Sequence, residues 1–204
     1  MANVQHAALT STDLHEPKGV AGASAFEVYV ANGAGSGAWT ISPHGWGLYA
    51  DSKTGAFDQT VTSTAARLQN DGDGAATVIT QLPPSIRGSG ALWDTTNDKF
   101  TPMQLHDSYV FSLSMTVTSE ATSPTELTVQ LDIGGTGSVS NVVLTHFSVL
   151  GKSVPYTLEM TSGAFVTSTM LTNGATIYVK TDTGSVHVND VTLLIQRVHG
   201  GTDW

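Results

Sequence analysis

Seven histidines are the first residues in this sequence that could do chemistry, because imidazole binds metal ions and carries protons near neutral pH. No two of them stand at the i, i+2 spacing of a strand or the i, i+4 spacing of a helix, which would direct two rings at one ion. The sequence therefore predicts no histidine metal site within one chain. His146 and His187 fall in expected strands, where three copies could meet on a threefold axis. The alternative is a strand histidine with an ordinary hydrogen bond.

Residues 70–74, Asn-Asp-Gly-Asp-Gly, offer oxygen ligands of the kind that calcium accepts, with Asp71 and Asp73 as the candidates. The segment lacks the further acidic ligand of a full calcium loop. Its Asp-Gly pairs also suit a polar hairpin loop, because glycine supplies a positive φ. We therefore expect no cofactor, with calcium at these two aspartates as the alternative.

Catalytic patterns are missing from the sequence. Asp94, Asp98, Asp107 and Asp132 are scattered over expected loops and strand ends, without the pairing that glycoside hydrolysis needs. There is no Gly-x-Ser-x-Gly elbow, and the glycine-rich run at 33–37 has no following Lys-Ser/Thr. We expect no catalytic residues and no enzyme activity.

Four tryptophans, Trp39, Trp46, Trp93 and Trp204, are candidates for binding, because a rigid ring can stack on a sugar or anchor an interface. Core packing is the alternative use of the same side chain.

Charge and composition narrow the class of partner. Eight Lys and Arg against seventeen Asp and Glu give a net charge of −9, which disfavours nucleic acid and membrane surfaces. Cysteine is absent, so disulfides and cysteine-bound metals are excluded. The first six residues, Met-Ala-Asn-Val-Gln-His, do not resemble a signal peptide, and we expect synthesis and assembly in the cytoplasm.

The elements that must position these residues are strands. Apolar residues occupy every odd position from Tyr109 to Val117 and again from Leu127 to Ile133, which predicts half-buried strands. Residues 142–150 are apolar on both faces in part and predict an inner strand covered on both sides. Further strands are expected at 61–68, 77–82, 156–160, 164–166, 176–180, 185–189 and 191–198, with turn residues between them.

The fold class predicted is therefore all-β, a jelly-roll sandwich with a mostly irregular N-terminal extension. Residues 1–50 lack sustained periodicity and contain one expected strand at 26–30. We expect two parts, an N-terminal segment at 1–50 and a jelly-roll domain at 51–204.

The N-terminal segment resembles that of a class of tailed-bacteriophage virion proteins. The resemblance lies in residues 6–9, His-Ala-Ala-Leu, in 13–20, Asp-Leu-His-Glu-Pro-Lys-Gly-Val, and in 28–33, followed by a Gly/Ser/Ala run ending at Trp39. The second part is similar to the trimeric jelly roll of tumour-necrosis-factor-like proteins and complement-type globular heads. That similarity rests on residues 92–94, 99–102, 108–111, 131–135, 172–177 and 193–197.

The resemblance implies a structural virion protein: a homotrimeric capsid decoration or head fibre, bound to a major capsid or tail protein. A tail-fibre module that binds a host-surface glycan for host attachment is the alternative. The residues expected to dock on the particle are His6, Leu9, Asp13, Leu14, His15, Glu16, Pro17, Lys18, Trp39 and Trp46. Trp39 and Trp46 are expected to be buried against a partner subunit or the particle shell.

Overall fold

The computed structural model describes residues 27–31, 37–41, 45–51, 59–70, 77–81, 91–122, 125–134, 141–149 and 151–200. The chain divides into two units, Met1–Ser42 and Pro43–Trp204, and each is treated by itself.

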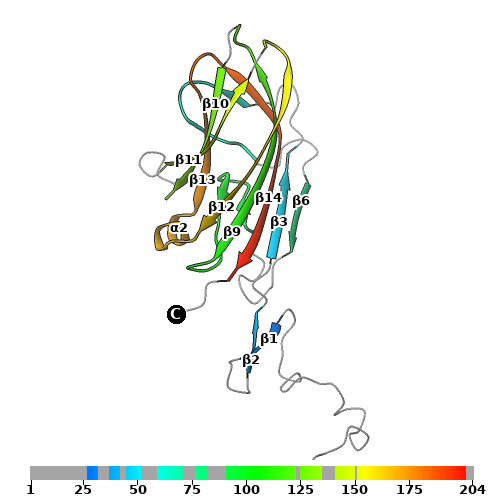
Figure 1. The fold of residues 1–204 in the computed structure, drawn as a ribbon, viewed down its shortest axis with the longest axis vertical. Coiled ribbons are helices and arrows are strands. Elements are labelled where there is room, and N and C mark those ends of the chain that lie inside the picture. The colour runs from blue at the N-terminus through cyan, green and yellow to red at the C-terminus, as the bar shows by residue number, and fades with distance from the viewer. Residues whose placement is uncertain are drawn as a thin grey trace, which may run out of the picture. The chain divides into compact units, whose positions relative to one another are not determined.

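The larger unit is built from two antiparallel six-stranded sheets (Figure 1). Sheet 1 has the order β12 (Pro155–Phe165), β9 (Ser108–Ser119), β14 (Val186–His199), β3 (Gly45–Ala50) and β6 (Thr77–Gln81), with β4 (Gln59–Val61) also paired to β14. Sheet 2 has the order β11 (Asn141–Val149), β10 (Thr125–Ile133), β13 (Ala175–Thr181), β8 (Lys99–Phe100) and β7 (Trp93–Asp94), with β5 (Ala66–Arg67) also paired to β13.

Nested strand pairing makes this unit a jelly roll. β3 pairs with β14 and β9 with β12 in sheet 1, whereas β8 pairs with β13 and β10 with β11 in sheet 2. These pairs run from the outermost to the innermost along the chain and alternate between the sheets, as when one long hairpin is rolled up. The predicted fold class is confirmed.

The core lies between the sheets and follows the alternation seen in the sequence. In β9, Tyr109, Phe111, Leu113, Met115 and Val117 are each at most 4% exposed, while the residues between them face outward. The inward side chains of both sheets form a single apolar cluster. Burying a side chain of this size contributes roughly 1.5–3 kcal/mol, so the cluster is the main source of stability.

A short helix, α2 (Ser168–Asn173), leads from β12 into β13. Thr167 caps it by accepting a hydrogen bond from the Met170 backbone, and Met170 is fully buried. Gly174 ends it with a φ of 78°, and an added Cβ there would lie 2.5 Å from the Phe100 carbonyl oxygen. Glycine is required at this turn because other residues rarely adopt a positive φ.

Three sequence expectations need correction. Residues 45–50 form β3 inside sheet 1, so the jelly roll begins before the predicted boundary at residue 50, and the chain divides at 42/43. β11 is the edge strand of sheet 2 and not an inner strand. The segments expected at 185–189 and 191–198 are one strand, β14, whose register shifts between Asn189 and Thr192 where Asp190 has a φ of 51°.

The smaller unit contains an antiparallel hairpin of β1 (Glu27–Ala31) and β2 (Gly37–Ile41). The sequence predicts only the first of these strands. Tyr29 and Trp39 are register partners, and their rings pack edge to face with centroids 5.5 Å apart. Such a pair stabilises a hairpin beyond its strand hydrogen bonds.

Candidate functional site

The outer face of sheet 1 is partly apolar, and its part over β3, β6 and β9 is uncharged, whereas Glu159 of β12 is exposed on the same face. Leu194, Leu48 and Ile79 form one row across β14, β3 and β6, because Leu194 pairs with Leu48 and Leu48 with Ile79. Beside this row stand Trp46, 37% exposed, and Val198, 47% exposed. Trp46 and Val198 line a groove of about 260 Å³ with Gly45, Gln196 and Arg197.

Charged residues are absent from much of this face. The sequences of β3, β6 and β9 contain no Asp, Glu, Lys or Arg, and the only one between Thr192 and Val198 of β14 is Arg197, which is buried. The outward residues of β9 are Ser108, Val110, Ser112, Ser114, Thr116 and Thr118. About a quarter to a third of an ordinary soluble surface is charged, so the surface over β3, β6 and β9 is unusually poor in charge.

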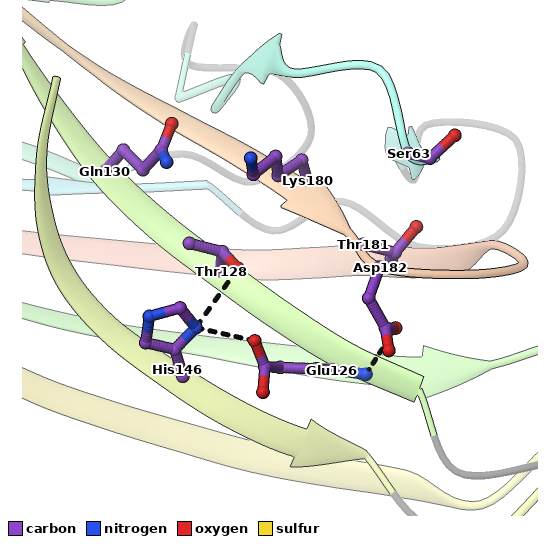
Figure 2. A pocket seen from close by; sticks show the side chains of 8 residues that line it. All are labelled: Ser63, Glu126, Thr128, Gln130, His146, Lys180, Thr181 and Asp182. Carbon is purple, nitrogen blue, oxygen red and sulfur yellow. Dashed lines mark hydrogen bonds and ion pairs between the residues drawn. The ribbon is translucent and has the colours of Figure 1, made fainter.

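The outer face of sheet 2 has the opposite character. A depression of about 440 Å³ is lined by Ser63, Glu126, Thr128, Gln130, His146, Lys180, Thr181 and Asp182, all polar or charged (Figure 2). Thr128 is the register partner of both His146 on β11 and Lys180 on β13, so the three residues share one row. The alternation of β10 directs Thr128 and Gln130 outward into this depression, while Leu127 and Val129 enter the core.

Hydrogen bonds fix two sides of the depression. His146 Nδ1 lies 2.6 Å from Glu126 Oε1 and 3.3 Å from Thr128 Oγ1. Asp182 Oδ1 accepts from the backbone N–H groups of Glu126, at 2.8 Å, and Thr183, at 2.7 Å. The Asp182 carboxylate thereby holds the end of β13 against the start of β10.

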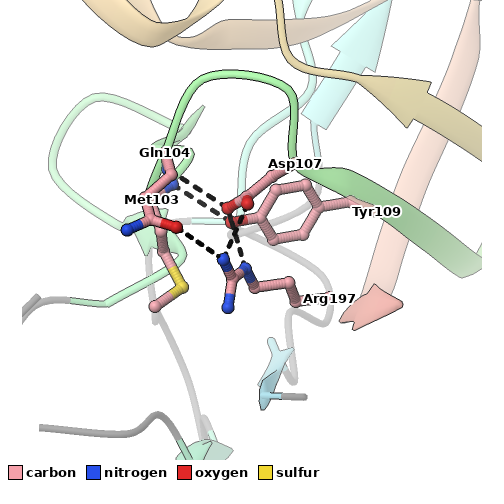
Figure 3. A network of polar contacts seen from close by, with 5 residues as sticks. All are labelled: Met103, Gln104, Asp107, Tyr109 and Arg197. Carbon is pink, nitrogen blue, oxygen red and sulfur yellow. Dashed lines mark hydrogen bonds and ion pairs between the residues drawn. The ribbon is translucent and has the colours of Figure 1, made fainter. Parts of the chain in front are cut away.

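A buried polar network closes one end of the sandwich (Figure 3). Arg197 donates from Nε to Asp107 Oδ2 at 2.8 Å and from Nη2 to Asp107 Oδ1 at 2.7 Å. Tyr109 donates its hydroxyl to Asp107 Oδ2, and the Gln104 side chain accepts from Arg197. Burial first, and the Asp107 charge second, raise the pKa of Tyr109 far above its ordinary value. This network is structural, because both charged groups are almost completely enclosed.

A second histidine–carboxylate pair joins β14 to the end of β9. His187 Nε2 lies 2.9 Å from Glu120, and Ser185 donates to the other oxygen of the same carboxylate. Hydrogen bonds from His187 and then Ser185 hold the pKa of Glu120 below its ordinary value.

The sequence-predicted residues are placed as follows. His146 and His187 both lie in strands and have hydrogen-bond partners within the chain. This agrees with the expectation of a strand histidine that makes an ordinary hydrogen bond. Trp46 lies on the outer face of sheet 1 and Trp39 in the hairpin, whereas Trp93 is 2% exposed and donates to the Asn70 carbonyl. Trp93 is therefore a core residue. Asn70 donates inward to the Tyr49 carbonyl.

Several predicted positions lie outside the described residues: the calcium candidates Asp71 and Asp73, the docking residues His6, Leu9, Asp13, Leu14, His15, Glu16, Pro17 and Lys18, and Trp204. Among the residues that the structure does describe, no three His, Asp or Glu side chains stand together as a metal site. No helix within the described ranges is long and apolar enough to cross a membrane.

Sequence reasoning missed both outer faces. Leu48, Ile79 and Leu194 are far apart along the chain, and only the strand order places them in one row. Lys180 and Asp182 carry no motif, and their meeting with Glu126 and His146 depends on the pairing of β13, β10 and β11. The absence of charge from β9 and β3 was a signal available in the sequence.

Comparisons with known proteins bear on the fold alone. No protein family model matches the sequence, and no curated protein is similar to it. Similar solved structures include Eiger, a TNF from S. frugiperda, at 10% identity over 79% of this chain and 97% of that chain, with a TM-score of 0.42.

Two further solved structures are weakly similar to this chain. One is the N-terminal CBM22-1–GH10 region of Clostridium thermocellum xylanase 10B complexed with xylohexaose, at 16% identity over 78% of this chain and 27% of that chain, with a TM-score of 0.33. The other is infectious bursal disease virus, Gx strain, at 10% identity over 85% of this chain and 38% of that chain, with a TM-score of 0.29. These similarities are too low to bear on function.

The strand pairing of the larger unit identifies it as an all-β jelly roll without the help of these comparisons.

Proposed function

We propose that this chain is a structural component of a bacteriophage particle: a homotrimeric capsid decoration or head fibre that docks through its N-terminal unit and has no catalytic activity. The observation that supports it most is the uncharged part of the outer face of sheet 1 over β3, β6 and β9, with its row of Leu194, Leu48 and Ile79. Such a face is unfavourable in water, and association with other copies of the chain would cover it.

The N-terminal unit supplies the second part of the proposal. Its hairpin presents Tyr29, 37% exposed, beside Trp39. Paired aromatic rings provide a rigid apolar anchor, and three such units on one trimer raise the effective concentration for docking. The stoichiometry of three, the phage particle and assembly in the host cytoplasm come from the sequence resemblance.

Particle incorporation tests this function. The full chain and a variant lacking residues 1–42, which keeps β3, are each supplied to a phage deleted for this gene. We expect mass spectrometry of purified particles to detect the full chain and not the truncated one. A full chain missing from purified particles would overturn the proposal, and normal incorporation of the truncated chain would overturn the docking assignment.

A second candidate function is attachment to a host-surface glycan, as in a tail fibre. The polar depression on sheet 2 favours it, because a rigid strand surface there presents several hydrogen-bonding side chains. Labelling this chain on intact particles separates the two: label over the head supports decoration, and label at the tail supports attachment.

A further inference from the structure

The depression on sheet 2 contains hydrogen-bonding atoms that the fold leaves unused. The Lys180 side chain makes no hydrogen bond or ion pair with any residue that the structure describes. Glu126, Asp182 and His146 each use one polar side-chain atom in the hydrogen bonds described above: Oε1, Oδ1 and Nδ1. Their second polar atoms, Oε2, Oδ2 and Nε2, make no hydrogen bond with any residue that the structure describes. The depression therefore presents a cationic donor, two carboxylate acceptors and an imidazole nitrogen.

The strands fix the backbone positions from which these groups extend. Glu126, Thr128 and Lys180 extend from the paired strands β10 and β13, and Glu126 is fixed through its bonds to His146. Thr128 is 5% exposed and Gln130 is 9% exposed, so the floor of the depression is packed and polar. A preorganised polar surface loses little conformational entropy when a ligand binds.

The chemistry of the walls indicates a ligand rich in hydroxyl groups. Donors and acceptors alternate over a short distance, and no large apolar side chain is among the lining residues (Figure 2). A hydroxyl group can donate to a carboxylate and accept from an ammonium at the same time. A volume of about 440 Å³ lies within the usual range of small-ligand sites.

The charge of the site decides between neutral and acidic ligands. Glu126 and Asp182 bring two carboxylates against the one ammonium of Lys180, and the whole chain carries −9. A uronic or sialic acid would meet like charges on two sides, which disfavours it.

We propose that the depression binds a neutral sugar residue, with Lys180 donating to its hydroxyls and Glu126 and Asp182 accepting from a neighbouring pair of hydroxyls. His146 acts as a positioning residue, because its Nδ1 holds the Glu126 carboxylate. This inference rests on the second candidate function and names its ligand class.

Saturation-transfer NMR on the full chain tests the proposal, with methyl glycosides of glucose, galactose, mannose and N-acetylglucosamine and with methyl glucuronide as the acidic comparison. We expect at least one neutral glycoside to bind, and the glucuronide to bind at least tenfold more weakly. Absence of binding by all four neutral glycosides, or a preference for the glucuronide, would overturn the proposal.

Two variants locate the site. Lys180→Met keeps the aliphatic stem and removes the ammonium, and we expect it to weaken binding about tenfold, which is the loss of one charge-assisted hydrogen bond of about 1.4 kcal/mol. Lys152→Met removes a lysine that does not line the depression and serves as the matched control. Equal binding by Lys180→Met and the unchanged chain would overturn the assignment.

Adsorption of particles to host cells is a separate readout. One outcome is that the purified chain binds sugar while Lys180→Met has no effect on adsorption. That result would reject the attachment function but would still support the sugar site. Loss of both would support the site and the attachment function together.

Discussion

The two sheets share one core, but their outer faces differ in charge. Sheet 1 presents Leu48, Ile79 and Leu194 beside strands β3, β6 and β9, which have no charged residues, and sheet 2 presents Glu126 and Lys180 around a depression. Because the core needs only the inward positions of each strand, the outward positions are free to serve binding. The inward side chains of each strand therefore stabilise the fold, and the outward side chains of the same strands are available for binding.

This division predicts that the largest losses of stability come from the layer between the sheets. Asp107→Ala removes the carboxylate that balances the charge of the buried Arg197 guanidinium, and we expect a loss of about 3–5 kcal/mol in the free energy of unfolding. Urea denaturation measures it. The double variant Asp107→Leu, Arg197→Met is the control, and it should lose less because no charge stays buried; an equal or larger loss would contradict this explanation.

A smaller loss is expected at the turn between α2 and β13. Gly174→Ala forces a positive φ on a residue with a Cβ and brings that Cβ against the Phe100 carbonyl oxygen. We expect the free energy of unfolding to fall by more than about 1 kcal/mol. Gly163→Ala, where the nearest atom would lie at 3.7 Å, is the matched control and should be better tolerated. Equal losses would show that the backbone at residue 174 is unstrained.

The outward positions should matter little for stability. Lys180→Met removes the ammonium of a half-buried side chain that has no partner among the described residues, and we expect a change within about 0.5 kcal/mol. Urea denaturation of the full chain measures it, as for Asp107→Ala. A loss of unfolding free energy close to that of Asp107→Ala would show that outward side chains also contribute strongly to stability, which contradicts this account.

The smallest effect concerns pH. The lowered pKa of Glu120 means that the folded state binds fewer protons than the unfolded state as the pH falls below the ordinary glutamate value of about 4.5. This contribution to stability is present above that value and disappears as the pH falls through the lowered pKa. We expect Glu120→Gln to make the thermal midpoint less dependent on pH in that acidic range. An unchanged pH profile would show that the His187 contact adds nothing.

The sequence predicted the strands whose inner and outer residues alternate. Tyr109 to Val117 form a strand whose buried positions recur every second residue, as predicted. Leu127 to Ile133 also form a strand, but it is not half-buried as expected, because Thr128, Gln130 and Asp132 on its other face are buried too. The expectation of an inner strand at residues 142–150 was wrong, because an edge strand can be as apolar in sequence as a covered one. Only the strand pairing shows that β11 has one neighbour in its sheet. The hairpin strand β2 was missed since its glycine- and alanine-rich sequence has little alternation.

The candidate sites were less predictable than the strands. A site on a sheet surface is assembled across strands, so the row of Leu194, Leu48 and Ile79 depends on register, which no local pattern encodes. Trp46 was singled out for binding from its ring alone, and the structure places it on the uncharged face beside that row.

Sedimentation equilibrium tests the central claim, that copies of this chain associate through the outer face of sheet 1. We expect the unchanged chain to sediment at three times its mass of 21.3 kDa. The double variant Trp46→Lys, Ile79→Lys should sediment as a monomer, whereas a control with Thr64→Lys and Gln69→Lys, at exposed positions away from that face, should remain a trimer. An unchanged chain that sediments at 21.3 kDa at micromolar concentration, or a trimer that survives the two lysines on sheet 1, would contradict the claim.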